Sequence, residues 1–176
     1  TGRVGHQSLD FDDVAVSDIA RRGLGVYVAT PQDRFSFGVF SSQSTESLGI
    51  ENFLGVEVED DRMFGATASI RPFAGNDLRL SVTGAEARGT AEGGLTVGEG
   101  DVASVAVDGS FFDSRGRFTF GTGVSTWDED ADGIVFSEDT GEAIVANIDY
   151  DILDGSDGTS LTVGLYYDRV EQGFFT

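Results

Sequence analysis

Hydrophobic and polar residues alternate along most of the chain, which is the pattern of β-strands whose two faces meet different surroundings. Between residues 35 and 39, for example, Phe35, Phe37 and Val39 alternate with Ser36 and Gly38. The same period recurs in seven further segments, at residues 24–29, 64–70, 78–83, 102–111, 118–124, 144–151 and 161–168. A ninth strand is predicted near residues 4–11, and a short helical turn at residues 17–22.

The connections between these strands alternate between short and long. Tight turns are predicted at residues 31–33, 74–77, 113–116 and 154–158, which are rich in residues that accept turn dihedrals. Longer links are predicted at residues 42–61, 88–100 and 128–141. The pattern therefore predicts an all-β fold, an antiparallel up-and-down meander of about eight or nine strands in a single domain spanning residues 1–176. Short turns at one end and long loops at the other are typical of transmembrane β-barrels.

The polar positions of these strands are occupied mainly by Gly, Ser, Thr and Ala, while the charges collect in the connections. A soluble sheet usually carries charged or long polar side chains on its solvent face. An apolar exterior around a small, polar interior instead suits a barrel in lipid. Aromatic residues near the strand ends are expected to form interfacial girdles, with ordinary packing as the alternative: Phe73, Phe112, Trp127, Tyr150, Tyr166 and Tyr167.

Charge and composition narrow the function classes. The chain has 31 acidic and 11 basic residues, all of the latter arginine, and its net charge of −20 disfavours nucleic acid as a partner. The absence of cysteine excludes disulfides, thiolate metal sites and cysteine nucleophiles. The apolar runs are much shorter than the roughly 20 residues of a spanning helix, so any crossing of a membrane must use strands. Such acidity fits a porin-like protein with acidic extracellular loops or a soluble protein adapted to high salt.

The alternation, the turn pattern and the segment VGHQSLDF at residues 4–11 resemble bacterial outer-membrane β-barrels of the porin type. The resemblance implies a location in the outer membrane, lipid as a partner, and passage of solutes or polymers through the wall. It implies no fixed catalytic residues. One departure is the sequence GFFT at residues 173–176, where such barrels often end in a strand with a terminal aromatic residue.

Strand direction leads to a further expectation about closure. In outer-membrane barrels the short turns and both chain ends normally face the periplasm. If each short turn follows a descending strand, the last predicted strand ascends and finishes on the side of the long loops. The chain is therefore expected to be part of a longer barrel, completed by the rest of a longer chain or by other barrel subunits.

The acidic segment at residues 128–139 has the spacing of a calcium-binding loop, with acids at positions 1, 3, 5 and 12 and Gly133 at position 6. Calcium is bound by several converging hard oxygens, which alternate acids in a tight loop can supply. The predicted ligands are the side chains of Asp128, Asp130, Asp132 and Asp139 and the carbonyl group of Ile134. Strand-like flanks exclude an EF-hand, and a solvated acidic loop is the alternative.

Charged residues within strands form the second candidate site. Arg79, Asp149 and Asp151 are predicted to face the barrel lumen, where they would shape ion selectivity or form interior ion pairs. An enzyme is not predicted. His6 and Ser8 would be about 6.6 Å apart on one strand face, too far for a nucleophile and its base. Two non-membrane alternatives stay open: a soluble β-sandwich or jelly roll that binds carbohydrate or calcium, and a structural subunit of a surface layer or filament.

Overall fold

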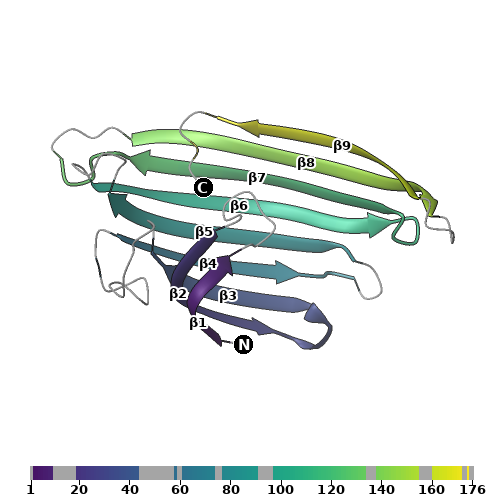
Figure 1. Ribbon diagram of the computed structural model, residues 1–176, viewed down its shortest axis with the longest axis horizontal. Helices are drawn as coiled ribbons and strands as arrows, with labels where there is room; N and C mark the ends of the chain where they lie inside the picture. Colours follow the sequence, from purple (N-terminus) through teal and green to yellow (C-terminus); the bar gives the residue numbers. More distant parts are fainter. Residues whose placement is uncertain are drawn as a thin grey trace.

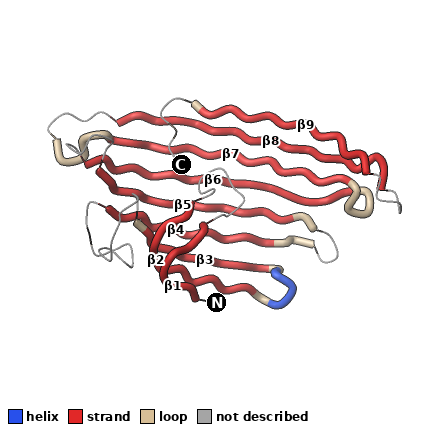
Figure 2. The backbone as a smooth tube through the Cα atoms, viewed as in Figure 1, coloured by secondary structure: helices blue, strands red, loops and turns tan. Residues whose placement is uncertain are grey.

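The described part of the chain forms one antiparallel sheet of nine strands, in which each strand pairs with its neighbours in sequence (Figure 1). The computed structural model describes residues 2–9, 19–43, 58, 61–73, 77–90, 97–133, 138–154, 160–171 and 174. The strands are β1 (Gly2–Leu9), β2 (Ile19–Ala29), β3 (Phe35–Ser42), β4 (Asp61–Ile70), β5 (Arg79–Thr90), β6 (Val97–Phe111), β7 (Gly116–Asp128), β8 (Glu138–Asp154) and β9 (Ser160–Val170). A 3-10 turn, η1 (Pro31–Asp33), joins β2 to β3 (Figure 2).

The predicted all-β meander is confirmed, and the strand expected near the beginning of the chain is present as β1. The predicted helical turn at residues 17–22 is wrong over its described part, because Ile19 already begins β2 and pairs with Leu9. Hydrogen bonds to β1 outweigh a helical tendency confined to six residues, too few to nucleate a stable helix. Several strands also extend into the predicted links. β6 begins at Val97 and β8 at Glu138.

The two faces of the sheet differ sharply in composition. Along one hydrogen-bonded row, β3 to β7 place Gly38, Thr67, Thr83, Ser104 and Gly123 side by side. The adjacent row, on the opposite face, contains Phe37, Ala68, Val82, Val105 and Thr122. We call these the polar face and the apolar face.

Polar side chains are buried and large apolar side chains are exposed, which is the reverse of a soluble protein. On the polar face Thr83 is 1% exposed and Ser104 3%, whereas on the apolar face Val105 is 53% exposed and Leu165 70%. Large hydrophobic side chains along β2 to β9 share this exposure. Soluble monomers rarely expose a continuous apolar surface of this extent, so the apolar face requires a non-aqueous neighbour or a protein partner.

The short turns step along the strand direction from hairpin to hairpin (Figure 1). Phe35, Val107 and Ala146 lie in one cross-strand row, which serves as a reference line for the stagger. The first short turn lies directly next to this row, because β3 begins at Phe35. β6 continues roughly four residues past Val107 and β8 roughly eight past Ala146. With a rise of about 3.3 Å per residue and about 4.8 Å between strands, this stagger inclines the line of turns by about 40° from the perpendicular to the strands.

The sheet is curved, and its ends are not joined in the part of the chain that the structure describes: β1 and β9 form its two edges. The β1–β2 end bends away from the plane of the remaining strands (Figure 1). Gly23 on β2 is packed tightly against β3: a Cβ atom there would be 2.8 Å from the Cα atom of Ser42 and would also collide with the Ser41 carbonyl oxygen. Only glycine fits such a close approach between β2 and β3.

Aromatic rings lie over glycines of neighbouring strands at several points of the sheet. The ring of Phe40 occupies the position of a side chain at Gly65, and the ring of Phe111 does the same at Gly116. Phe118 likewise packs against Gly109 across the β6–β7 pair. A ring that covers a cross-strand glycine restores the packing that the missing side chain would have provided. The high glycine content is therefore part of the sheet itself.

Candidate functional site

The polar face carries a layer of hydroxyl groups along its middle. The Thr83 hydroxyl donates a hydrogen bond of 2.9 Å to the Thr67 hydroxyl, and the Ser36 and Ser69 hydroxyls are 2.6 Å apart. These side chains are short, and those of Ser36, Thr67 and Thr83 are at most 9% exposed. Their hydroxyl groups therefore satisfy one another across the strands.

A charged band crosses the polar face nearer the short turns. Arg79 on β5 lies on this face, and its Nε atom is 2.8 Å from Oδ1 of Asp108 on β6. About a quarter to a third of each side chain is exposed, at 32% and 26%. The sequence identified Arg79 but not its partner, because only the strand register places Asp108 directly opposite Arg79.

Asp149 and Asp151 lie on the same face as Arg79 by register but do not pair with it. Asp149 accepts a hydrogen bond of 2.9 Å from the Asn147 side-chain amide. Asp151 accepts one of 2.6 Å from the Thr162 hydroxyl across the β8–β9 pair. The three predicted residues are thus split between β5 and β8, two ends of a band that spans several strands.

A second charged residue of this band, besides Asp108, was missed by the sequence reasoning. Arg117 on β7 lies directly opposite Asp149 on β8, with its side chain exposed. Its position between Gly116 and Phe118, on the polar side of the alternation, was the available signal. Arg34 and Arg71 lie in the same cross-strand row as Arg79, because the Arg71 N–H donates to the Arg34 carbonyl and Ile70 pairs with Leu80. The band therefore carries both acidic and basic side chains.

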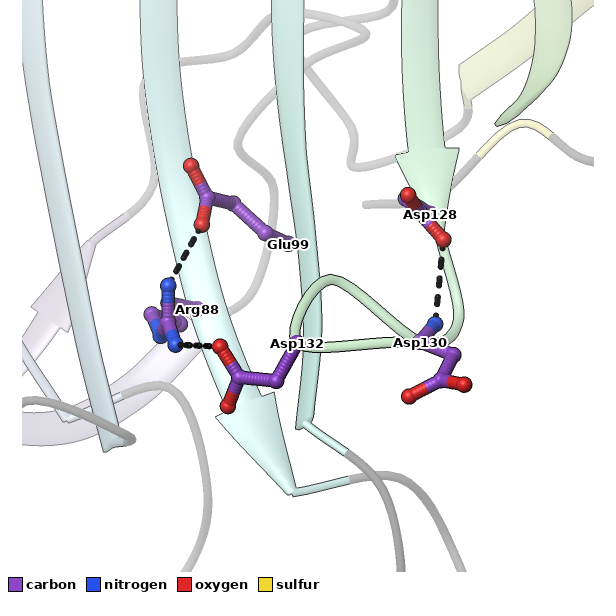
Figure 3. Close-up of polar contacts among 5 residues, drawn as sticks. All are labelled: Arg88, Glu99, Asp128, Asp130 and Asp132. Atoms are coloured by element: carbon purple, nitrogen blue, oxygen red, sulfur yellow. Dashed lines mark hydrogen bonds and ion pairs between the residues drawn. The ribbon is translucent and has the colours of Figure 1, made fainter. Parts of the chain in front are cut away.

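The predicted calcium loop is held by a salt-bridge clamp (Figure 3). Arg88 on β5 contacts Glu99 on β6 at 2.8 Å and Asp132 in the loop at 2.7 Å, and its own side chain is only 15% exposed. The backbone N–H of Ala131 also donates to the Val97 carbonyl at 3.0 Å. Arg88 thereby fastens the loop after β7 to the neighbouring hairpin.

The predicted calcium ligands are not gathered around one point. Asp132 faces Arg88, while Asp128 accepts a 3.0 Å hydrogen bond from the Asp130 backbone N–H (Figure 3). Asp139 belongs to β8, and Ile134 lies outside the described residues. Among the residues that the structure describes, no group of three acidic side chains is placed to share a metal ion. Calcium binding by this loop stays a prediction, and it would require Asp132 to leave Arg88.

Aromatic residues gather at the short-turn end of the apolar face. Phe111 stacks on Tyr150 with ring centroids 6.3 Å apart, and Phe112 meets both rings edge-on. The Arg115 guanidinium lies 5.7 Å from the centroid of Tyr150. Arg115 also donates hydrogen bonds to the carbonyl groups of Asp151 and Ile152. This cluster has the composition of an interfacial girdle.

The aromatic residues predicted to form girdles do not all lie on one face of the sheet. Phe112, Tyr150 and the exposed Phe73 lie at the short-turn end, and Tyr167 lies on the apolar face. Trp127 and Tyr166 belong to the polar face, because they pair with Gly100 and Asn147 of that face. The face on which each aromatic residue lies follows from the alternation of side chains along its strand. Its distance from the strand end does not determine that face.

Comparison with known proteins gives no match to a family model, a curated protein or a solved structure.

The described part of the chain contains no helix with the length and apolar character needed to cross a membrane.

Proposed function

We propose that this chain forms wall strands of a bacterial outer-membrane β-barrel, a porin-like channel or a component of an export pore. The observation that carries the proposal is the reversed burial of the sheet, with exposed hydrophobic side chains on one face and shielded hydroxyl groups on the other. Lipid acyl chains would cover the apolar face, and the polar face would line the water-filled interior.

The dimensions of the apolar face support this proposal. On β8 the apolar positions run from Ile144 to Leu153, close to the roughly 9–11 residues with which a strand crosses the hydrocarbon layer. The aromatic cluster around Tyr150 lies at one end of this stretch. At the other end the same face becomes charged, with Glu86, Arg88 and Glu99. An apolar belt with an aromatic rim and a charged rim matches the layers of a bilayer.

The stagger of the turns supports the same proposal independently of burial. Strands in closed barrels tilt by about 35–45° from the barrel axis, and the stagger of the hairpins fixes that tilt. The inclination of about 40° found for the turns falls within this range. In the soluble β-sandwich alternative, a second sheet would cover the apolar face. The described residues form a single sheet.

Site-directed labelling tests the proposal, since the chain has no native cysteine. Single substitutions Phe120→Cys and Val124→Cys on the apolar face would be compared with Thr119→Cys and Asn147→Cys on the polar face. Each variant would carry an environment-sensitive fluorophore in lipid vesicles. We expect lipid-like emission at the first two positions and water-like emission at the other two. Failure to enter vesicles, or water-like emission at all four positions, would refute the membrane proposal.

A further inference from the structure

The polar face contains one apolar cluster, which interrupts its lining of small and hydroxyl-bearing residues. Phe40, Met63, Ala85 and Val102 come from the four consecutive strands β3 to β6, and each is at most 9% exposed. Phe40, Ala85 and Val102 share one hydrogen-bonded row with Gly65, and Met63 lies in the next row of the same face. We call these four residues the apolar cradle.

The cradle is occupied by an aromatic residue from beyond the last strand. Phe174 packs against the cradle together with Ala87. Its ring lies 3.2 Å from the position of a Cβ atom at Gly123 on β7, two strands inward from the edge strand β9. Two backbone hydrogen bonds form just after β9. The Glu171 N–H donates to the Glu142 carbonyl, and the Phe174 N–H donates to the Glu171 carbonyl.

We propose that Phe174 is a displaceable plug, an aromatic side chain that seats in the apolar cradle and narrows the interior of the pore. This inference rests on the proposed channel function. The ring contacts side chains of the cradle and the bare backbone of Gly123. The ring is held by apolar burial and the backbone of Phe174 by one local hydrogen bond to Glu171, so the ring can leave the cradle without breaking a strand pairing.

The cradle is apolar whereas its neighbours on the polar face are serines, so the Phe174 ring binds best at this one position. Ser104 and Ser125 adjoin Val102 on the polar face, and both are polar and buried. An aromatic ring would gain little against such hydroxyl groups, but it gains contact area against Phe40, Met63 and Val102. The glycine at position 123 leaves room for the tip of the ring, and a larger side chain there would meet it.

Electrical recordings of the intact chain in planar lipid bilayers test the plug. Phe174→Ala is expected to raise the time-averaged conductance about twofold or more, because more of the channels would have an empty cradle and a wider interior. Phe174→Leu, which keeps an apolar side chain, should stay near the original conductance. Phe112→Ala is the matched control, because Phe112 is an aromatic residue on the outside of a turn and 72% exposed.

Fluorescence provides a second measurement that does not depend on conduction. In Trp127→Phe/Phe174→Trp, the only tryptophan reports on the seat. Blue-shifted emission and weak quenching by acrylamide are expected, and adding Met63→Ser should reverse both. A water-exposed indole would overturn the plug. So would equal conductance of Phe174→Ala and the original chain. Absence of conductance in every variant, with the indole still seated, would instead refute the channel and with it the plug's proposed role.

Discussion

The ring of Phe40 on β3 lies where a side chain of Gly65 on β4 would be. The two residues face each other in the strand register, so the glycine makes room for a ring that also forms part of the apolar cradle. Gly84, on the opposite face of the next strand, has no such neighbour. The nearest atom to a Cβ at Gly84 is the Val102 carbonyl oxygen at 3.8 Å.

This difference predicts opposite effects of the same substitution. Gly65→Ala should destabilise the fold by about 1–3 kcal/mol, because the added methyl group displaces the Phe40 ring in a packed site. Gly84→Ala should be neutral or slightly stabilising, since alanine loses less backbone entropy than glycine on folding. Denaturant titration of both variants in the same detergent or lipid measures the free energies of unfolding. Equal effects would show that the ring does not depend on the glycine.

A positive charge in the middle of the apolar face should be costly. Val105→Arg is expected to destabilise the protein in lipid vesicles by about 2–4 kcal/mol, the cost of arginine near the bilayer midplane. Thr119→Arg, on the polar face of β7, should cost much less because its guanidinium can remain in water. Folding titrations into vesicles compare the two variants with the original chain. A greater loss from Thr119→Arg would contradict the assignment of the faces.

The carboxylates of the charged band on the polar face are expected to favour cations over anions. Asp149→Asn/Asp151→Asn should lower the ratio of cation to anion permeability, because it removes two carboxylates of this band while its arginines remain. The reversal potential under a potassium chloride gradient measures this ratio. Asp113→Asn, in the exposed turn after β6, is the matched control and should leave the reversal potential unchanged. An unchanged potential in the double variant would exclude the band from selectivity.

Calcium binding at residues 128–139 is expected to be weak, because Asp132 must exchange its contact with Arg88 for the ion. Arg88→Gln should tighten calcium binding severalfold by releasing Asp132. Asp130→Asn/Asp132→Asn should abolish the binding, since it removes two of the proposed ligands. Isothermal titration calorimetry on the intact chain compares the three proteins. Identical heats in all of them would leave a solvated acidic loop held by a salt bridge.

The period of two was enough to predict the strands and the faces of most of their residues. Alternation alone was enough to predict that Phe37, Ala68 and Val82 lie on the apolar side of their strands. The Arg79–Asp108 pair could not, since a cross-strand partner depends on register, and register depends on turn lengths that the sequence specifies only within a few residues. Asp132 was read as a metal ligand from spacing within its loop, whereas its contact is with Arg88, which is 44 residues away.

All the strand pairings that the structure describes are between neighbours in the chain. A hairpin can therefore form as soon as its second strand is available, without waiting for a distant segment, and the growing sheet always offers an edge for the next strand. Each pairing step therefore closes only a short loop and loses little chain entropy. The same order means that a hairpin could be duplicated or lost during evolution without re-pairing the others, which would change the circumference of the wall and leave the inclination of its strands intact.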